Sequence, residues 1–198
     1  IDFSRSAQPL IEITSDAAIA DAAAAVAALD LPVRLVIDAT GFLHGDDAYP
    51  EKAIAEIDSA HMAEAFAVNA TGPALLMKHF LPLLADEGKA VFCTLSARVG
   101  SIADNRLGGW YSYRASKAAL NQLVRTAAIE LKRRRPAAVC VAYHPGTVDS
   151  KLSAPFQKSG LDVQSPAAAA EACLSVLDDL TAADSGGFFD YSGTAVPW

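Results

Sequence analysis

The sequence predicts an α/β fold in which a parallel sheet is covered by helices. Short apolar runs alternate with longer amphipathic stretches, the order expected of strands joined by helical crossovers. The run at residues 138–143 contains Val-Cys-Val-Ala without polar alternation, which is typical of a parallel strand buried on both faces. The 198 residues are 52% hydrophobic and contain no repeat, so we expect a single domain over residues 1–198.

Five short runs are predicted as strands because they are apolar and are bounded by polar or turn-forming residues. They lie, in chain order, at residues 10–13, 33–39, 89–95, 138–143 and 185–191. The last of them holds Gly186 and Gly187 and a short aromatic strand.

Longer stretches between these runs are predicted as helices, and most have a recognisable start or end. They lie at residues 15–29, at 59–68 continuing past Asn69 into 74–84, at 111–135 and at 166–180. The first begins with a Thr14/Ser15 cap, the helix at 111–135 is ended by Pro136, and the last has proline in its first turn.

Composition and charge exclude several classes of protein. Sixteen Lys and Arg against 23 Asp and Glu give a net charge of −7, which repels a phosphate backbone, so no nucleic-acid partner is expected. No apolar run approaches the ~20 residues of a membrane helix, and no signal-peptide pattern is present. We therefore expect a cytoplasmic protein with no membrane partner.

Cysteine and histidine spacing gives no support to a metal site. The four histidines share no ligand spacing, and the cysteines form no Cys-x-x-Cys pattern. We expect the cysteines to be small core residues. They are Cys93, Cys140 and Cys173.

Tyr113 and Lys117 are four residues apart near the start of the helix at 111–135. Side chains at this spacing lie on one helix face, one turn apart, so the two groups can act on the same small volume. An ammonium shielded from water favours phenolate over phenol, so we expect Lys117 to lower the pKa of Tyr113. Such a tyrosine can exchange a proton with a carbonyl or alcohol oxygen.

The string at residues 113–121, Tyr-Arg-Ala-Ser-Lys-Ala-Ala-Leu-Asn, resembles the catalytic helix of the short-chain dehydrogenase/reductases. Asp38-Ala39-Thr40-Gly41 resembles the family's Asn-Asn-Ala-Gly turn, with Asp38 in place of the first asparagine. The resemblance implies a Rossmann-type, doubly wound parallel sheet and an NAD(P)-dependent oxidoreductase for a small carbonyl or secondary alcohol substrate. It also implies a homodimer or homotetramer.

The resemblance assigns roles to further residues. Tyr113 becomes the general acid/base and Lys117 the residue that tunes it and holds the nicotinamide ribose, while Asn69 matches the asparagine of the proton relay. Glu12 takes the place of an aspartate that meets the adenine. The turn after the strand at 138–143 is implied to seat the nicotinamide, with Ala39 and Gly41 also at the cofactor. That turn comprises Pro145, Gly146, Thr147 and Val148.

The family's usual catalytic serine is not where its pattern predicts it. Counting back three residues from Gly100 reaches Ala97, so Ser96 and, by proximity only, Ser101 are the candidates to steady the carbonyl. A missing donor to the reacting oxygen can cost ~10²-fold in rate. Efficient catalysis is therefore in question, which keeps a nucleotide-binding regulatory protein open as the alternative.

The glycine-rich turn that follows the first strand of this fold is absent from the sequence. We expect that ~35–45 N-terminal residues, about one strand, turn and helix, precede the chain. Residues 1–3 are then the end of the second strand, and Arg5 lies in the loop beside the adenosine ribose. An arginine there suits a 2′-phosphate and favours NADP over NAD.

Several other residues are open to two interpretations. Arg98 and Arg106 flank the loop at 96–109 and suit either an acidic substrate or, more often, the surface. Trp110 and Tyr111 suit a pocket wall, a packed core or a subunit contact. The basic run at residues 132–135 is interpreted as a solvated end of its helix.

The string at residues 96–101 and the chain end, Gly187-Phe188-Phe189 followed by Val196-Pro197-Trp198, are similar to the C-factor-like subgroup of the family. That subgroup is named for a bacterial cell-to-cell signalling member. This likeness motivates the regulatory alternative as much as the missing serine does.

Overall fold

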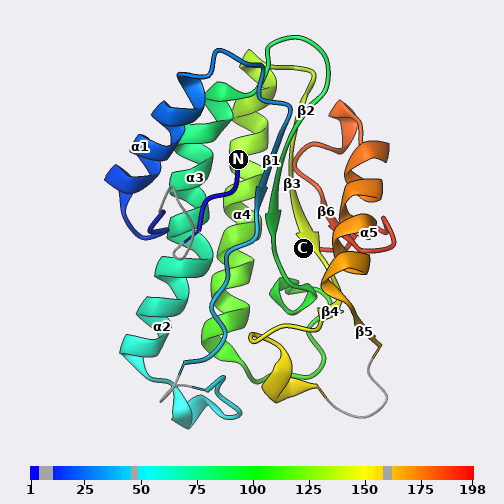
Figure 1. Cartoon of the computed structure of the whole chain (residues 1–198). Coiled ribbons are helices and arrows are strands. Elements are labelled where there is room, and N and C mark those ends of the chain that lie inside the picture. The colour runs from blue at the N-terminus through cyan, green and yellow to red at the C-terminus, as the bar shows by residue number, and fades with distance from the viewer. Residues whose placement is uncertain (5–10, 46–48, 158–161) are drawn as a thin grey trace.

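A computed structural model describes residues 1–4, 11–45, 49–157 and 162–198. Its centre is a four-stranded, fully parallel sheet in the order β1-β2-β3-β6 (Figure 1). The strands are β1 (Leu35–Asp38), β2 (Ala90–Leu95), β3 (Ala138–His144) and β6 (Phe188–Asp190). A separate two-stranded sheet pairs β4 (Thr147–Val148) with β5 (Val163–Gln164). The predicted α/β class is confirmed.

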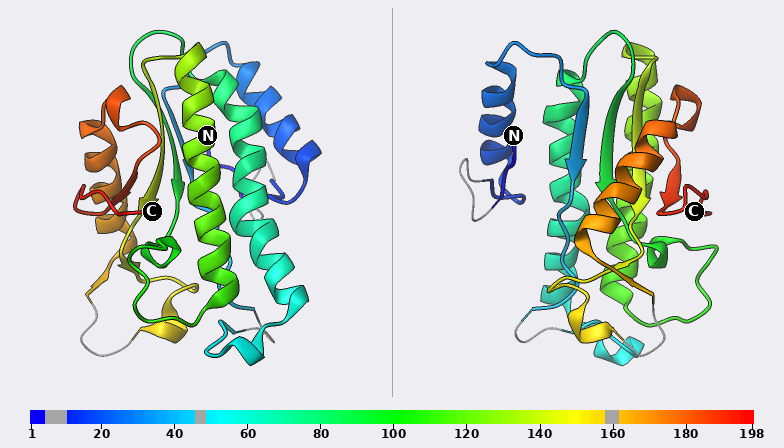
Figure 2. Two further views of the ribbon diagram at one scale, coloured as in Figure 1. Left: turned by 180° about the vertical axis from the view of Figure 1, so that it is seen from behind. Right: turned by 45° about the vertical axis from the view of Figure 1, so that its right-hand side comes forward.

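Helices cover the central sheet on both faces, as a doubly wound fold requires (Figure 2). One face carries α1 (Asp16–Ala27), α3 (Gly72–Phe80) and α4 (Tyr111–Arg134), and the other carries α5 (Pro166–Asp179). α2 (Ser59–Phe66) leads into α3 through a π-helical turn at Ala67–Thr71. Short 3-10 turns lie at Ile54–Glu56, Leu81–Leu83, Arg98–Gly100, Ala154–Phe156 and Ala182–Asp184.

The core consists of two apolar layers, one on each face of the sheet. Phe92 and Cys140 point to the α1, α3 and α4 side, whereas Val91 and Val141 point to α5. All three cysteines are free and buried, as predicted.

The predicted strand at residues 10–13 is wrong for the described residues 11–13. They form an extended link and a turn, in which the Glu12 carboxylate accepts hydrogen bonds from the Thr14 amide (3.2 Å) and hydroxyl (3.0 Å). The turn leads directly to Ser15, whose hydroxyl caps α1 by accepting from the Ala18 amide. The Ile11 amide donates to the Ser4 carbonyl (3.2 Å), but the side-chain hydrogen bonds of Glu12 turn the chain directly afterwards, so residues 11–13 form no strand.

In the described sheet β1 pairs on one side only, with β2. Leu35 and Ile37 on this strand are 43% and 42% exposed, unlike the residues of β2 and β3. Among the described residues, no helix is long and apolar enough to cross a bilayer.

Candidate active site

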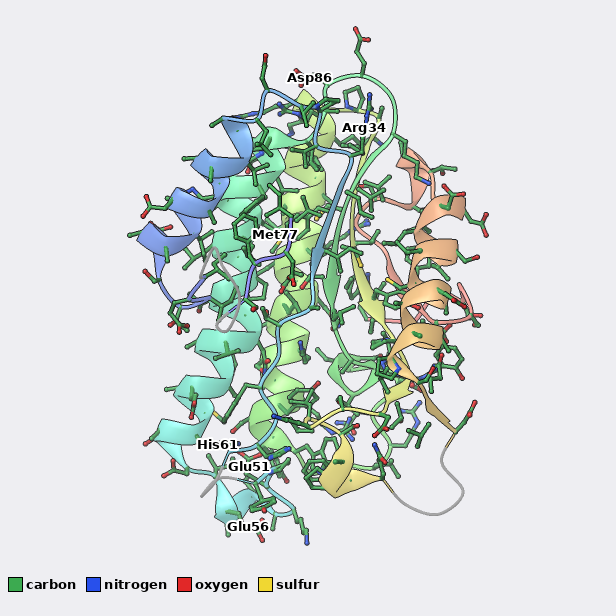
Figure 3. All side chains as sticks on the ribbon, in the orientation of Figure 1. Arg34, Glu51, Glu56, His61, Met77 and Asp86 are labelled. Atoms are coloured by element: carbon green, nitrogen blue, oxygen red, sulfur yellow. The ribbon has the colours of Figure 1, made fainter. Side chains whose placement is uncertain are left out.

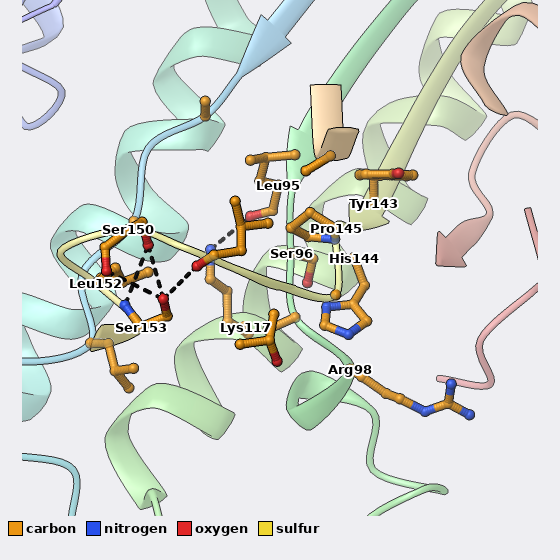
Figure 4. Close-up of a pocket in the computed structure, with 18 of the residues that line it drawn as sticks. Leu95, Ser96, Arg98, Lys117, Tyr143, His144, Pro145, Ser150, Leu152 and Ser153 are labelled. Carbon is orange, nitrogen blue, oxygen red and sulfur yellow. Dashed lines mark hydrogen bonds between the residues drawn. The ribbon is translucent and has the colours of Figure 1, made fainter. Parts of the chain in front are cut away.

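A cavity of about 830 Å³ lies beyond the carboxyl ends of β1, β2 and β3 (Figure 4). Loops leave the sheet at this edge, and open α/β sheets bind their ligands there. The turn after β1, the segment after β2 and the turn after β3 line it, together with residues 150–156 and the first turns of α4 and α5.

Tyr113 and Lys117 both line the cavity from the first turns of α4, as their spacing predicted. Their side chains are almost fully buried, and Lys117 Nζ lies 5.9 Å from the centroid of the Tyr113 ring. The ammonium donates one hydrogen bond, to the Leu95 carbonyl at the end of β2 (2.7 Å). An ammonium has three donors, so two are left without a partner in the described part of the chain.

Burial controls the protonation of both groups. It raises the pKa of the Tyr113 phenol above its ordinary value and lowers the pKa of Lys117 to about 8, against the opposing effect of Asp38. The prediction that Lys117 lowers the pKa of Tyr113 is therefore wrong for this structure. The reason is that desolvation of the phenolate dominates where the ammonium lies over the ring.

Asn69 lies in the π-helical turn and ties the turn after β1 to α4. Its Oδ1 accepts from the Phe42 amide (2.7 Å), and its Nδ2 donates to the Phe42 carbonyl (2.7 Å) and to Ser116 Oγ (3.1 Å). A Cβ added to Gly41 would lie 3.9 Å from Asn69 Oδ1 and 4.0 Å from Lys117 Nζ. Gly41, Asn69 and Lys117 are thus neighbours, although Asn69 itself is fully buried beneath the cavity lining.

Asp38 shapes the turn after β1 from below the cavity. Its carboxylate accepts from the Thr40 amide (3.0 Å) and hydroxyl (2.6 Å), and from the Thr94 hydroxyl on β2 (2.6 Å). Asp38 is buried, whereas Ala39 and Gly41 line the cavity. The Asp38 carboxylate therefore fixes the conformation of the turn and does not itself line the cavity.

Three candidate positions for a carbonyl-binding serine are distinguished by their contacts. Ser96 lines the cavity, but its hydroxyl donates to Asn121 Oδ1 (2.6 Å). Ala97 lines the cavity and belongs to the same apolar cluster as Tyr113, so this position offers a methyl group and no hydroxyl. Ser101 is not part of the lining, and its hydroxyl accepts from the Asp104 amide (3.1 Å).

The turn after β3 brings Pro145, Gly146, Thr147 and Val148 to the cavity together. Gly146 has φ +77°, and a Cβ there would lie 2.7 Å from Gln164 Nε2 and 2.9 Å from Tyr191. Gln164 donates to the Pro145 carbonyl (3.0 Å), which fixes the turn against β5. Only glycine fits this conformation and this close approach.

The remaining predicted residues differ in where they lie. Arg5 falls outside the described residues, and Glu12 is occupied with Thr14 and is not in the lining. Arg98 lines the cavity, but it pairs with Asp104 (2.7 Å) and Asp190 (3.4 Å). Arg106 is exposed.

Glu51 holds the start of α4, a feature that sequence reasoning missed (Figure 3). Glu51 is 3% exposed. Its carboxylate accepts from the Ser112 amide (3.1 Å) and hydroxyl, while its carbonyl accepts from the Trp110 amide. Trp110 has φ 54°, unusual for a bulky residue, and precedes the first turn of α4. Burial alone would raise the pKa of Glu51, but the Ser112 hydrogen bonds hold it below its ordinary value.

Two further features bear on the chemistry of this edge. His144, at the end of β3, lines the cavity, and burial lowers its pKa to about 4, so its imidazole is neutral at pH 7. Among the described residues, no group of three or more His, Cys, Asp or Glu side chains could hold a metal ion.

Sequence comparison finds relatives across most of the chain. The family model described as enoyl-(acyl carrier protein) reductase matches residues 7–178. C-signal of Myxococcus xanthus is 40% identical over 147 residues, which cover 74% of this chain and 84% of that protein. The 1-hydroxy-2-glutathionyl-2-methyl-3-butene dehydrogenase of Rhodococcus sp. (strain AD45) is 28% identical over 191 residues, covering 96% and 80%.

Solved structures share the fold over 96% of the chain. The NADPH-bound carbonyl reductase from chicken fatty liver is 31% identical, with a TM-score of 0.82 and 76% of that chain covered. Carbonyl reductase Sniffer of D. melanogaster has the same TM-score at 24% identity, with 77% covered. The doubly wound, Rossmann-type arrangement predicted above is confirmed.

Proposed function

Because the chain belongs to the short-chain dehydrogenase/reductase family, we propose that it is an NAD(P)-dependent oxidoreductase that interconverts a carbonyl and a secondary alcohol. The observation that carries the proposal is the buried Tyr113–Lys117 pair that lines the cavity at the strand ends. The small-molecule character of the substrate agrees with the carbonyl reductases of the same fold.

The residues present fit a nicotinamide nucleotide. Lys117 is a buried ammonium with two spare donors, which suit the hydroxyls of a ribose. The Gly146 turn exposes backbone groups where a side chain would clash with Gln164 and Tyr191. When bound, the reduced cofactor supplies a hydride, that is two electrons and one hydrogen nucleus, to the carbonyl carbon.

Tyr113 supplies the proton in the direction of reduction. Its raised pKa keeps the phenol protonated at neutral pH, so it can donate to the carbonyl oxygen as that oxygen gains charge. The remaining phenolate lies beside the Lys117 ammonium until it takes a proton from solvent. Hydride plus proton convert the carbonyl to the alcohol, and the reverse reaction returns both.

Asn69 and Ser96 have supporting roles in this proposal. Asn69 continues the proton relay from Lys117, and its hydrogen bonds to Phe42 and Ser116 hold the turn after β1 against α4. Ser96 can reach a substrate oxygen only by releasing Asn121, so Tyr113 is the principal donor. Ala97 gives the carbonyl one hydrogen bond fewer than a serine at that position would, which predicts modest turnover.

NADP is proposed as the preferred cofactor. Arg5 motivates this preference through its charge, and the carbonyl reductase of chicken fatty liver was solved with NADPH. Isothermal titration of both nucleotides tests it: tighter binding of NADPH than of NADH is expected, and the opposite order contradicts the preference.

The test of the proposed activity is the substitution Tyr113→Phe. NADPH absorbance is followed with a panel of ketones and aldehydes, and turnover by the variant is expected to fall by about 10²–10⁴-fold. Tyr111→Phe, two residues earlier on the same helix and outside the cavity lining, is the matched control and should keep its activity. Equal turnover by wild type and Tyr113→Phe contradicts the proposal.

A second candidate is a nucleotide-binding regulatory protein with little turnover. The methyl group of Ala97 beside Tyr113 favours it, as does the 40% identity to C-signal. Nucleotide binding by calorimetry without turnover of any carbonyl compound in the panel would favour this second candidate over the enzyme.

A further inference from the structure

We infer that the cavity selects a neutral carbonyl compound carrying a bulky apolar, preferably aromatic, group on one side of the carbonyl. The inference rests on the proposed function and adds the class of substrate. Its basis is an apolar cluster that surrounds the Tyr113 phenol on the outer side of the cavity. The cluster, named here the outer wall, consists of Leu43, Ala97, Val99, Trp110, Leu152 and Phe156.

Aromatic rings extend from the proton donor along this wall. Trp110 stands 6.2 Å from Tyr113 at an interplanar angle of 71°, and Phe156 stands 5.1 Å from Trp110 at 62°. Edge-to-face rings at these separations present flat apolar faces, against which another ring packs favourably. A substituent on the carbonyl carbon would meet these rings while its oxygen faces Tyr113.

The outer wall is held in place before any ligand arrives. His44 contacts Phe156 edge-on at 5.5 Å, and its Nε2 lies 3.3 and 3.2 Å from the Lys151 and Leu152 carbonyls. On the other side, the Glu51 carbonyl holds the Trp110 amide. A preformed wall loses little freedom when a ligand binds, so it contributes to selection.

Charge at the cavity argues against an anionic substrate. Arg98 and Lys117 are the cations of the described lining, and Arg98 is paired with Asp104 and Asp190. Figure 4 shows the Arg98 guanidinium extended away from Lys117. Lys117 is 2% exposed and lies beside the Tyr113 ring, and His144 is neutral at pH 7 because burial lowers its pKa. A carboxylate or phosphate next to the carbonyl would therefore enter an apolar surface unpaired.

The experiment compares three ketones under identical conditions: acetophenone, 2-butanone and pyruvate. With saturating NADPH, kcat/KM for acetophenone is expected to exceed that for 2-butanone by about tenfold or more, and pyruvate should be the poorest substrate. Phe156→Ala should lower the acetophenone to 2-butanone ratio by about tenfold. Trp198→Ala removes an aromatic ring that stacks on Phe188 outside the cavity lining, and should leave that ratio unchanged.

The possible outcomes distinguish a failure of the proposed function from a failure of the inferred substrate class. No turnover of any of the three ketones, with NADPH bound, contradicts the proposed function itself. Turnover without a preference for acetophenone, or with a preference for pyruvate, leaves the function standing and overturns the substrate class. Equal ratios for wild type and Phe156→Ala overturn the part assigned to the outer wall.

Discussion

The two halves of α4 bury different kinds of side chain. Residues 111–121 bury five polar groups together with Leu120. Residues 122–134 bury only Val124, Ala128 and Leu131, the apolar stripe of an ordinary amphipathic helix. The buried polar residues of the first half are Ser112, Tyr113, Ser116, Lys117 and Asn121.

This difference indicates that residues 111–121 of α4 serve the site, whereas residues 122–134 stabilise the fold. Burying polar groups opposes folding unless each has a partner, and most in the first half do. Ser112 has Glu51, Ser116 has Asn69, and Lys117 has the Leu95 carbonyl. The second half stabilises the fold by apolar contact with the sheet.

The largest effect, on kcat/KM, is expected when residues 111–121, the half of α4 with buried polar side chains, lose the Lys117 ammonium. Lys117→Met keeps the length of the side chain but removes the charge and the donors, so kcat/KM should fall by about 10²–10⁴-fold. Lys132→Met, in the exposed last turn, is the matched control and should keep wild-type kinetics. Equal kinetics for the two variants would contradict the assignment of chemistry to the first half.

Lys117→Met should also change how the free energy of unfolding depends on pH. The pKa of Lys117 is about 8 in the fold against 10.5 when unfolded, so between these values the unfolded chain binds more protons. The Lys117 contribution therefore makes the free energy of unfolding rise with pH, by about 3 kcal/mol at most. Urea unfolding at pH 7.5 and 10 should show this rise in wild type relative to Lys117→Met; equal pH dependence contradicts the burial argument.

The opposite result, a loss of stability without a loss of activity, is expected for a substitution in residues 122–134, the half of α4 with buried apolar side chains. Leu131→Ala removes a buried side chain from the cluster packed on the sheet, and should lower the free energy of unfolding by about 2–5 kcal/mol. Its kcat per folded molecule should stay at the wild-type value because Leu131 lies outside the cavity lining. Urea unfolding and NADPH oxidation measure the two quantities. A large fall in kcat with little loss of stability would contradict a purely stabilising role for this half of α4.

The start of α4 should show an intermediate effect. Glu51→Gln weakens the bonds to Ser112 and removes a negative charge from a helix N-terminus, and we expect a loss of about 1–2 kcal/mol. Because the pKa of Glu51 is below 4.5 in the fold, this stabilisation is complete at neutral pH and is lost as pH falls through the folded pKa.

The control for this change is Glu56→Gln, which alters an exposed acid of the same segment that accepts from the Lys52 amide (2.8 Å). Urea unfolding at pH 7 and pH 4 compares the variants. Equal stability of wild type and Glu51→Gln at pH 7 would show that the carboxylate does not hold the helix start.

Local patterns in the sequence predicted the elements whose signals are short-range. Capping predicted the start of α1 at Ser15, and unalternating apolar residues predicted β3. The four-residue spacing of Tyr113 and Lys117 placed both at one cavity. The run at residues 10–13 failed because the Glu12 and Thr14 side chains form a turn that periodicity does not register.

Features that depend on contacts between distant residues were not predictable. Glu51 is 61 residues from Ser112, and nothing in its own neighbourhood marks it as the partner of α4. The raised pKa of Tyr113 depends on how completely the fold buries the phenol, which spacing on a helix does not reveal. The aromatic wall likewise joins Trp110 to Phe156 across two loops.

The smallest effect is expected at the exposed end of the apolar half. Arg134 lies 3.9 Å from Glu130, with side chains 74% and 69% exposed, so water and salt screen the pair. Arg133→Ala and Arg134→Ala should each change the free energy of unfolding by no more than about 0.5 kcal/mol. Arg135 differs, because its guanidinium donates to the Leu84 (2.8 Å) and Pro82 (2.8 Å) carbonyls and pairs with Asp86 (3.0 Å). Arg135→Ala should therefore cost more than either neighbour in urea unfolding; equal losses at all three positions would mean that this basic run acts only as solvated charge.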